Sequence, residues 1–132
     1  MKKIQRFLLP YLSFTDFNVI NLNLSLKNKK LTIFIDGAYL NINNGIYFEK
    51  GLLRFTNWES ISIRKYDYHF KTWIHLNEIE NVESLENICK TSFSKSHVIL
   101  SGFAKKSGQW MEWEITHAKI VAEFEPEPES EF

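Results

Sequence analysis

Cysteine, proline and glycine are scarce in this sequence, and long hydrophobic runs are absent. The 132 residues include one Cys, three Pro and five Gly, which excludes a disulfide-stapled scaffold, a collagenous chain and a Pro/Gly-rich disordered chain. No stretch approaches the roughly 20 consecutive apolar residues of a membrane-spanning helix, so we expect no membrane association. The single Cys89 cannot form an internal disulfide, and we therefore expect a reducing compartment, the cytoplasm.

The chain also has no excess of positive or negative charge, because 16 Lys and Arg balance 16 Asp and Glu. Basic residues outnumber acidic ones in the first half of the chain, and the reverse holds in the second half. Aromatic and basic side chains interleave between Arg64 and Lys71, a pattern that suits single-stranded nucleic acids. However, a neutral chain with an acidic C-terminus lacks the attraction that phosphates require. We therefore expect no nucleic-acid partner.

Aromatic residues are abundant, at 15% of the chain, and apolar residues recur mostly with a period of two. This period is typical of half-buried strands. The clearest strand is expected at residues 20–26, where four aliphatic side chains alternate with polar ones. Turns are predicted near Asp36-Gly37, Asn44-Gly45 and Lys50-Gly51, with short strands between them. Further strands are expected at residues 31–35, 46–48, 53–55, 61–64, 66–76 (one long strand, or two with a bend), 98–103, 110–116 and 118–124.

One segment has a helical period instead. Apolar residues recur at spacings of three and four from Ile79 to Cys89, and Glu86 precedes Lys90 by four residues. This pattern predicts an amphipathic helix of two to three turns. Asn77, Asn81 and Ser84 are alternative N-caps for it.

These elements predict a mainly β fold, either an antiparallel β-sandwich or a partly closed barrel, with about eight or nine strands and one short helix. Strands with one apolar face must bury it against a second sheet or against themselves. Residues 1–124 are expected to form a single β-rich domain. Residues 125–132 form an acidic C-terminal tail that we expect to be extended and mobile, since Pro126 and Pro128 disfavour central strand pairing.

Motifs for catalysis or metal binding are missing. The four His residues lack the close pairing of zinc ligands, and no Gly-x-Ser-x-Gly elbow is present. Cys89 lies on the apolar stripe of the predicted helix, where a free cysteine behaves as a small hydrophobe. We therefore expect no metal, no cofactor and no enzymatic activity.

A candidate partner-binding surface follows from the alternation in residues 110–116. If Met111, Trp113 and Ile115 face the core, then the side chains between them are exposed together. A ring beside carboxylates is suited to a basic protein partner, because rings contribute affinity and charges accelerate association. The predicted partner-binding residues are Trp110, Glu112 and Glu114, together with Glu83 and Glu86 from the acidic run that also holds Glu78 and Glu80.

Three stretches carry a resemblance: residues 51–58 (GLLRFTNW), 101–103 (SGF) and 107–113 (SGQWMEW). Together they resemble small, mostly β bacterial proteins that act as immunity partners in polymorphic or contact-dependent toxin systems. The resemblance implies a cytoplasmic protein that binds and occludes a cognate toxin domain, often a nuclease, whose basic active site an acidic surface would fit. It implies no catalytic residues. The alternative is a β-barrel that binds a small apolar molecule in a cavity lined by the aromatic residues.

Overall fold

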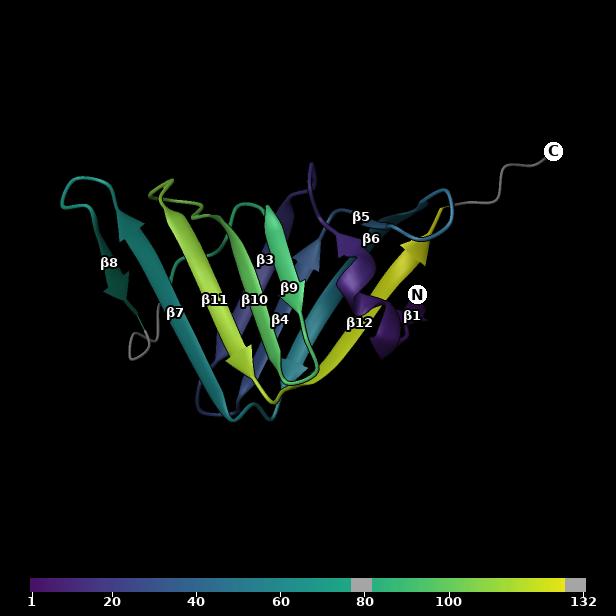
Figure 1. The fold of residues 1–132 in the computed structure, drawn as a ribbon, viewed down its shortest axis with the longest axis horizontal. Coiled ribbons are helices and arrows are strands. Elements are labelled where there is room, and N and C mark those ends of the chain that lie inside the picture. The colour runs from purple at the N-terminus through teal and green to yellow at the C-terminus, as the bar shows by residue number, and fades with distance from the viewer. Residues whose placement is uncertain (77–81, 128–132) are drawn as a thin grey trace.

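The computed structural model describes residues 1–76 and 82–127, which form two antiparallel sheets (Figure 1). These residues contain twelve strands and one short 3₁₀ helix. In chain order the elements are β1 (Lys2–Ile4), η1 (Arg6–Tyr11), β2 (Leu12–Ser13), β3 (Val19–Ser25), β4 (Lys30–Ile35), β5 (Ala38–Leu40), β6 (Ile46–Thr56), β7 (Ser60–Asp67), β8 (Thr72–His75), β9 (Lys90–Phe93), β10 (His97–Phe103), β11 (Trp110–Thr116) and β12 (Lys119–Pro126).

The mainly β prediction is confirmed, and of the two architectures left open the structure has the sandwich. The seven-stranded sheet has the order β1-β12-β6-β4-β3, with β5 beside β6 and β2 beside β5. The five-stranded sheet has the order β8-β7-β11-β10-β9 and lies in front of the other in Figure 1. The sheets stay separate and do not close into a barrel.

The core lies between the two sheets and is built by the period-two alternation of the central strands. Strands β4, β6 and β12 supply it from one side, and β7, β10 and β11 supply it from the other. Each large apolar side chain removed from water contributes roughly 1.5–3 kcal/mol. Among the side chains with almost no exposed surface are Leu31, Ile33, Leu53, Phe55, Phe124, Ile63, Leu100 and Trp113.

The predicted turn near Lys50-Gly51 is wrong, because β6 runs through these residues without interruption. Gly51 faces the core opposite Phe124 of β12. A Cβ atom there would collide with the Glu123 carbonyl oxygen and the Phe124 ring. This glycine therefore permits close approach of β12 and does not turn the chain.

The predicted helix is also wrong in the part that the structure describes. Residues 82–89 form an extended connecting segment without helix, and residues 77–81 lie outside the described residues. Leu85 and Ile88 are buried, as their spacing indicated. The backbone of the segment, however, pairs with other elements: Glu86 N–H donates to the Phe103 carbonyl, and Val19 N–H donates to the Glu86 carbonyl. Tertiary pairing thus overrides the local helical period.

The strand number exceeds the expected eight or nine because several strands are too short to show alternation. Strands β1, β2 and β9 have two to four residues each.

The short helix of the structure is η1, which lies in the N-terminal region. Strand β12 continues to Pro126, beyond the last pair that it forms with β1, so the proline occupies an edge position. Residues 128–132 of the predicted tail lie outside the described residues.

Candidate functional site

Strand β11 places the predicted residues Trp110, Glu112 and Glu114 on the outer face of the five-stranded sheet. The residues that alternate with them are fully buried, as the alternation predicted: Met111, Trp113 and Ile115. Among the elements that the structure describes, none lies over this outer face in Figure 1. The three predicted residues therefore share one face of the sheet.

Four aromatic side chains extend across this face and form what we call the aromatic row. The row consists of Trp73 (β8), Tyr66 (β7), Trp110 (β11) and Phe103 (β10). Tyr66 lies opposite Trp73, with ring centroids 5.3 Å apart. Phe103 lies opposite Trp110, with centroids 5.2 Å apart. The pairing of β7 with β11 ends at Lys65 opposite Met111, and Tyr66 and Trp110 are the next residues of the two strands.

Of these four rings, the sequence analysis identified only Trp110 as a binding residue. The other three come from different strands, and strand order is not encoded in a local pattern. The alternation predicted for residues 66–76 puts Tyr66 and Trp73 on opposite sides, and they share a face because the chain turns between β7 and β8. Cross-strand aromatic pairs of this kind stabilise a sheet and present a broad apolar surface.

Glu112 is paired with Arg64 of β7. The Nη2 and Nε atoms of Arg64 donate to Glu112 Oε2 over 2.7 and 3.2 Å. The guanidinium carbon also lies 3.9 Å from the centroid of the Trp73 ring, a cation–π geometry. The Arg64 side chain is 39% exposed and the Glu112 side chain is 24% exposed. The carboxylate is thus held in one orientation beside the aromatic row.

Glu114 is the most accessible carboxylate of the predicted set that has a partner. Its Oε1 atom lies 2.6 Å from Nε2 of His97, and 49% of its side chain is exposed. Lys90 and His75 belong to the same row of residues as Glu112 and Arg64. The outer face therefore carries both signs of charge and is less acidic than the sequence alone implies.

Glu83 is used within the chain. Its Oε2 atom accepts a hydrogen bond of 2.9 Å from Lys65 Nζ, and its Oε1 atom accepts from the backbone N–H groups of Lys106 and Ser107. Only 13% of its side chain is exposed. Burial by itself raises the pKa of Glu83, but the bonds from Lys65, Ser107 and Lys106 outweigh it and lower the pKa to about 2. Glu83 therefore anchors the connecting segment to the β10–β11 turn.

Glu86 is exposed and lies beside the aromatic row through its backbone bond to Phe103. Its side chain has no hydrogen bond or ion pair within residues 1–76 and 82–127. Glu78 and Glu80, from the same acidic run, lie outside the described residues. Of the acids in the connecting segment, Glu86 is the one left available to a partner.

Burial raises the pKa of the Cys89 thiol, which keeps the thiol protonated at neutral pH. Within residues 1–76 and 82–127, no three His, Cys, Asp or Glu side chains are grouped closely enough to hold a metal ion. In the same residues, no helix is long and apolar enough to cross a membrane.

No family model, curated protein or solved structure shows a significant match to this chain.

Proposed function

We propose that this chain is a non-enzymatic protein-binding module that docks a basic protein partner on the outer face of its five-stranded sheet. The observation that carries the proposal is the aromatic row, which lies next to oriented carboxylates on a sheet face that no other described element covers. A merely solvated face does not need four aromatic side chains in register. Aromatic anchors surrounded by polar groups are typical of the energetic centre of an interface.

The carboxylates of Glu112 and Glu114 would select a basic partner by binding its cationic side chains in addition to, or in place of, Arg64 and His97. Glu114 is half exposed and can accept a Lys or Arg of the partner in place of His97. Glu112 stays oriented by Arg64, so its unused oxygen Oε1 is available for a second cation. Because both pairs are near the surface, exchange costs little, and salt should weaken the complex.

The finer form of the proposal is an immunity protein that acts in the cytoplasm by occluding a bacterial toxin domain, possibly a nuclease. It rests on the resemblance of residues 51–58, 101–103 and 107–113, and two of these stretches contribute Phe103, Trp110 and Glu112 to the outer face. A toxin active site that binds phosphates is basic and would meet Glu112 and Glu114.

The experiment compares matched variants of the two sheets. Trp110→Ala and Glu114→Lys alter the outer face of the five-stranded sheet, while Phe34→Ala and Glu123→Lys likewise remove a ring and reverse a charge on the outer face of the other sheet. A partner captured by the wild-type protein is purified, and its affinity for each variant is measured by calorimetry at two salt concentrations. We expect at least tenfold weaker binding for the first pair and unchanged binding for the second.

Equal losses in both pairs, or losses confined to the control pair, would show that the outer face of the five-stranded sheet is not the docking surface. The immunity form has its own readout. The partner should arrest growth when expressed alone, and co-expression of the wild-type chain should restore growth, whereas Trp110→Ala should not. A harmless partner would rule out this form and leave the docking proposal standing.

A further inference from the structure

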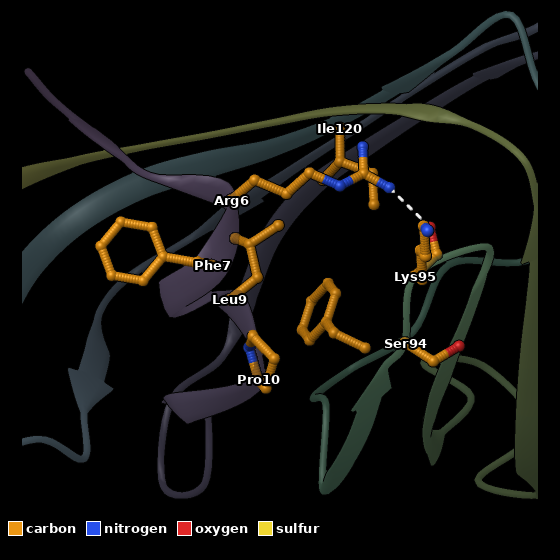
Figure 2. A pocket seen from close by; sticks show the side chains of 8 residues that line it. Arg6, Phe7, Leu9, Pro10, Ser94, Lys95 and Ile120 are labelled. Carbon is orange, nitrogen blue, oxygen red and sulfur yellow. Dashed lines mark hydrogen bonds between the residues drawn. The ribbon is translucent and has the colours of Figure 1, made fainter.

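A cleft with a volume of about 510 Å³ opens between η1, the β9–β10 turn and the start of β12 (Figure 2). We call it the N-terminal cleft. Its size lies within the roughly 300–1,000 Å³ that small-molecule sites occupy. It shares no residue with the aromatic row. The lining residues are Arg6, Phe7, Leu9, Pro10, Phe93, Ser94, Lys95 and Ile120.

The walls of the cleft are apolar and firmly held. Leu9 is 3% exposed and belongs to the hydrophobic core, and Phe93 and Ile120 pack against that core while remaining half-buried. Pro10 restricts the backbone of η1 on the same side. Phe7 projects away from the other labelled side chains in Figure 2 and adds an exposed ring at the rim. An apolar molecule would find preformed walls here.

Two cations lie at the mouth of the cleft. Arg6 extends from η1 across to the β9–β10 turn, where its Nη2 atom donates a hydrogen bond of 2.9 Å to the Lys95 carbonyl oxygen (Figure 2). This bond uses one of the five guanidinium N–H donors and holds the group in place. None of the lining residues is acidic. Neither Arg6 nor Lys95 forms an ion pair with any residue in the described part of the chain.

We propose that the N-terminal cleft binds a small amphipathic anion, an apolar chain or ring that ends in a carboxylate. The apolar body lies against Leu9, Phe93 and Ile120, and the carboxylate meets Arg6 and Lys95. A guanidinium presents paired N–H donors that match the two oxygens of a carboxylate. A neutral ligand would leave both cations without a counter-charge, and a cationic ligand would be repelled.

Decanoate is a suitable probe, used below the concentration at which it forms micelles. Amide chemical shifts of the full chain are followed during titration, with butyrate and decylammonium as matched ligands that lack the long chain or reverse the charge. We expect saturable binding of decanoate with shifts concentrated at Leu9, Phe93 and Ser94, and at least tenfold weaker binding of the other two. Equal affinity for decanoate and decylammonium, or shifts centred elsewhere, would overturn the proposal.

A pair of double variants tests the role of the cations. Arg6→Gln/Lys95→Gln removes both charges from the cleft, and Lys27→Gln/Lys105→Gln removes two exposed charges from turns outside it. All four side chains are exposed, so both variants should fold, and the amide spectra verify this. We expect the first variant to bind decanoate at least tenfold more weakly and the second to bind it as the wild type does. Equal binding by the two variants would overturn the assignment of Arg6 and Lys95.

Discussion

The two faces of the five-stranded sheet are built from the same strands, yet they differ in kind. The inner face of β11 holds side chains without exposed surface, whereas its outer face holds Trp110 and two paired carboxylates. The step from Arg64 to Lys65 on β7 shows the same contrast, because Arg64 pairs with Glu112 outside and Lys65 pairs with Glu83 on the inner side. Burial explains the apolar side chains of the inner face, whereas the outer face combines aromatic rings with paired charges.

The outer face of the seven-stranded sheet provides a second reference. Its central row holds Asn23, Thr32, Arg54 and Val121, which lie opposite one another in β3, β4, β6 and β12. This row holds one amide, one hydroxyl, one guanidinium and one aliphatic side chain, and it contains neither a ring nor a carboxylate. The contrast holds for this central row, since Tyr39 of β5 and Tyr47 of β6 form an aromatic group with Phe17 elsewhere on the seven-stranded sheet.

The largest expected effect of a substitution is at the inner face. Trp113→Ala removes a fully buried indole and should lower the free energy of unfolding by about 3–5 kcal/mol. Trp113→Phe should cost less than half as much, because the indole Nε1 has no hydrogen-bond partner among the described residues. Urea unfolding measures both. Trp110→Ala is the outer-face control, and a loss as large as that of Trp113→Ala would contradict the assignment of the two faces.

The next effect is at Gly102, an inner-face position of β10. A Cβ atom there would collide with the Asn87 carbonyl oxygen in the connecting segment. Gly102→Ala should therefore destabilise the fold by about 1–3 kcal/mol through overpacking. Ser92→Ala, at an exposed outer-face position of β9, should change stability by no more than about 0.5 kcal/mol. Thermal unfolding of the two variants compares them, and a neutral Gly102→Ala would show that the connecting segment is not packed there.

The contribution of the Lys65–Glu83 ion pair to the free energy of unfolding should depend on pH. The pKa of Glu83 is about 2 in the folded chain against an ordinary value of 4.5, so its stabilisation is present above pH 4.5 and is lost as the pH falls toward 2. Glu83→Gln should cost about 1–2 kcal/mol at neutral pH, less than the full pKa difference implies, because solvent screens the pair. Unfolding measured from pH 7 to 2.5 should show the two proteins converging. A constant difference across this range would refute the linkage.

The smallest effect on stability is expected for the outer ion pair. Glu112→Gln breaks a partly exposed pair with Arg64 and should cost about 0.2–1 kcal/mol in a urea titration. If the proposed docking is right, partner affinity should fall even so, and the two measurements together separate a role in binding from a structural one. A larger loss of stability than for Glu83→Gln would reverse the comparison between the faces.

Alternation was enough to predict much of the sandwich, since strands β3, β4, β10 and β11 lie close to their expected positions. The prediction of secondary structure failed where one local pattern is compatible with two different structures. Lys50-Gly51 is a turn signal, but Gly51 serves the close approach of Phe124. The spacing of Leu85 and Ile88 fits a helix, yet both side chains are buried from an extended backbone.

The candidate site likewise has a part that the sequence predicted and a part that it did not. The sequence indicated that Trp110, Glu112 and Glu114 share a face, because residues two apart in a strand point to the same side. It gave no sign that Glu83 is bound to Lys65 and to the backbone of Lys106, since the groups involved are at least 18 residues apart. The predicted acidic surface is therefore smaller in the structure than in the sequence.

By itself, the sequence determined the fold class and the buried side of strands such as β4 and β11, because both follow from the two-residue period of a single strand and from the transfer of apolar side chains out of water. Ile20 was expected on the buried side of β3 but is 56% exposed, because the register of β3 against β4 shifts between Val19 and Asn21. Only the tertiary structure decided which strands are neighbours, and with that the aromatic row, the Glu83 anchor and the N-terminal cleft. Each of these joins residues from separate segments, and a contact across segments depends on strand order and register, which no local pattern contains.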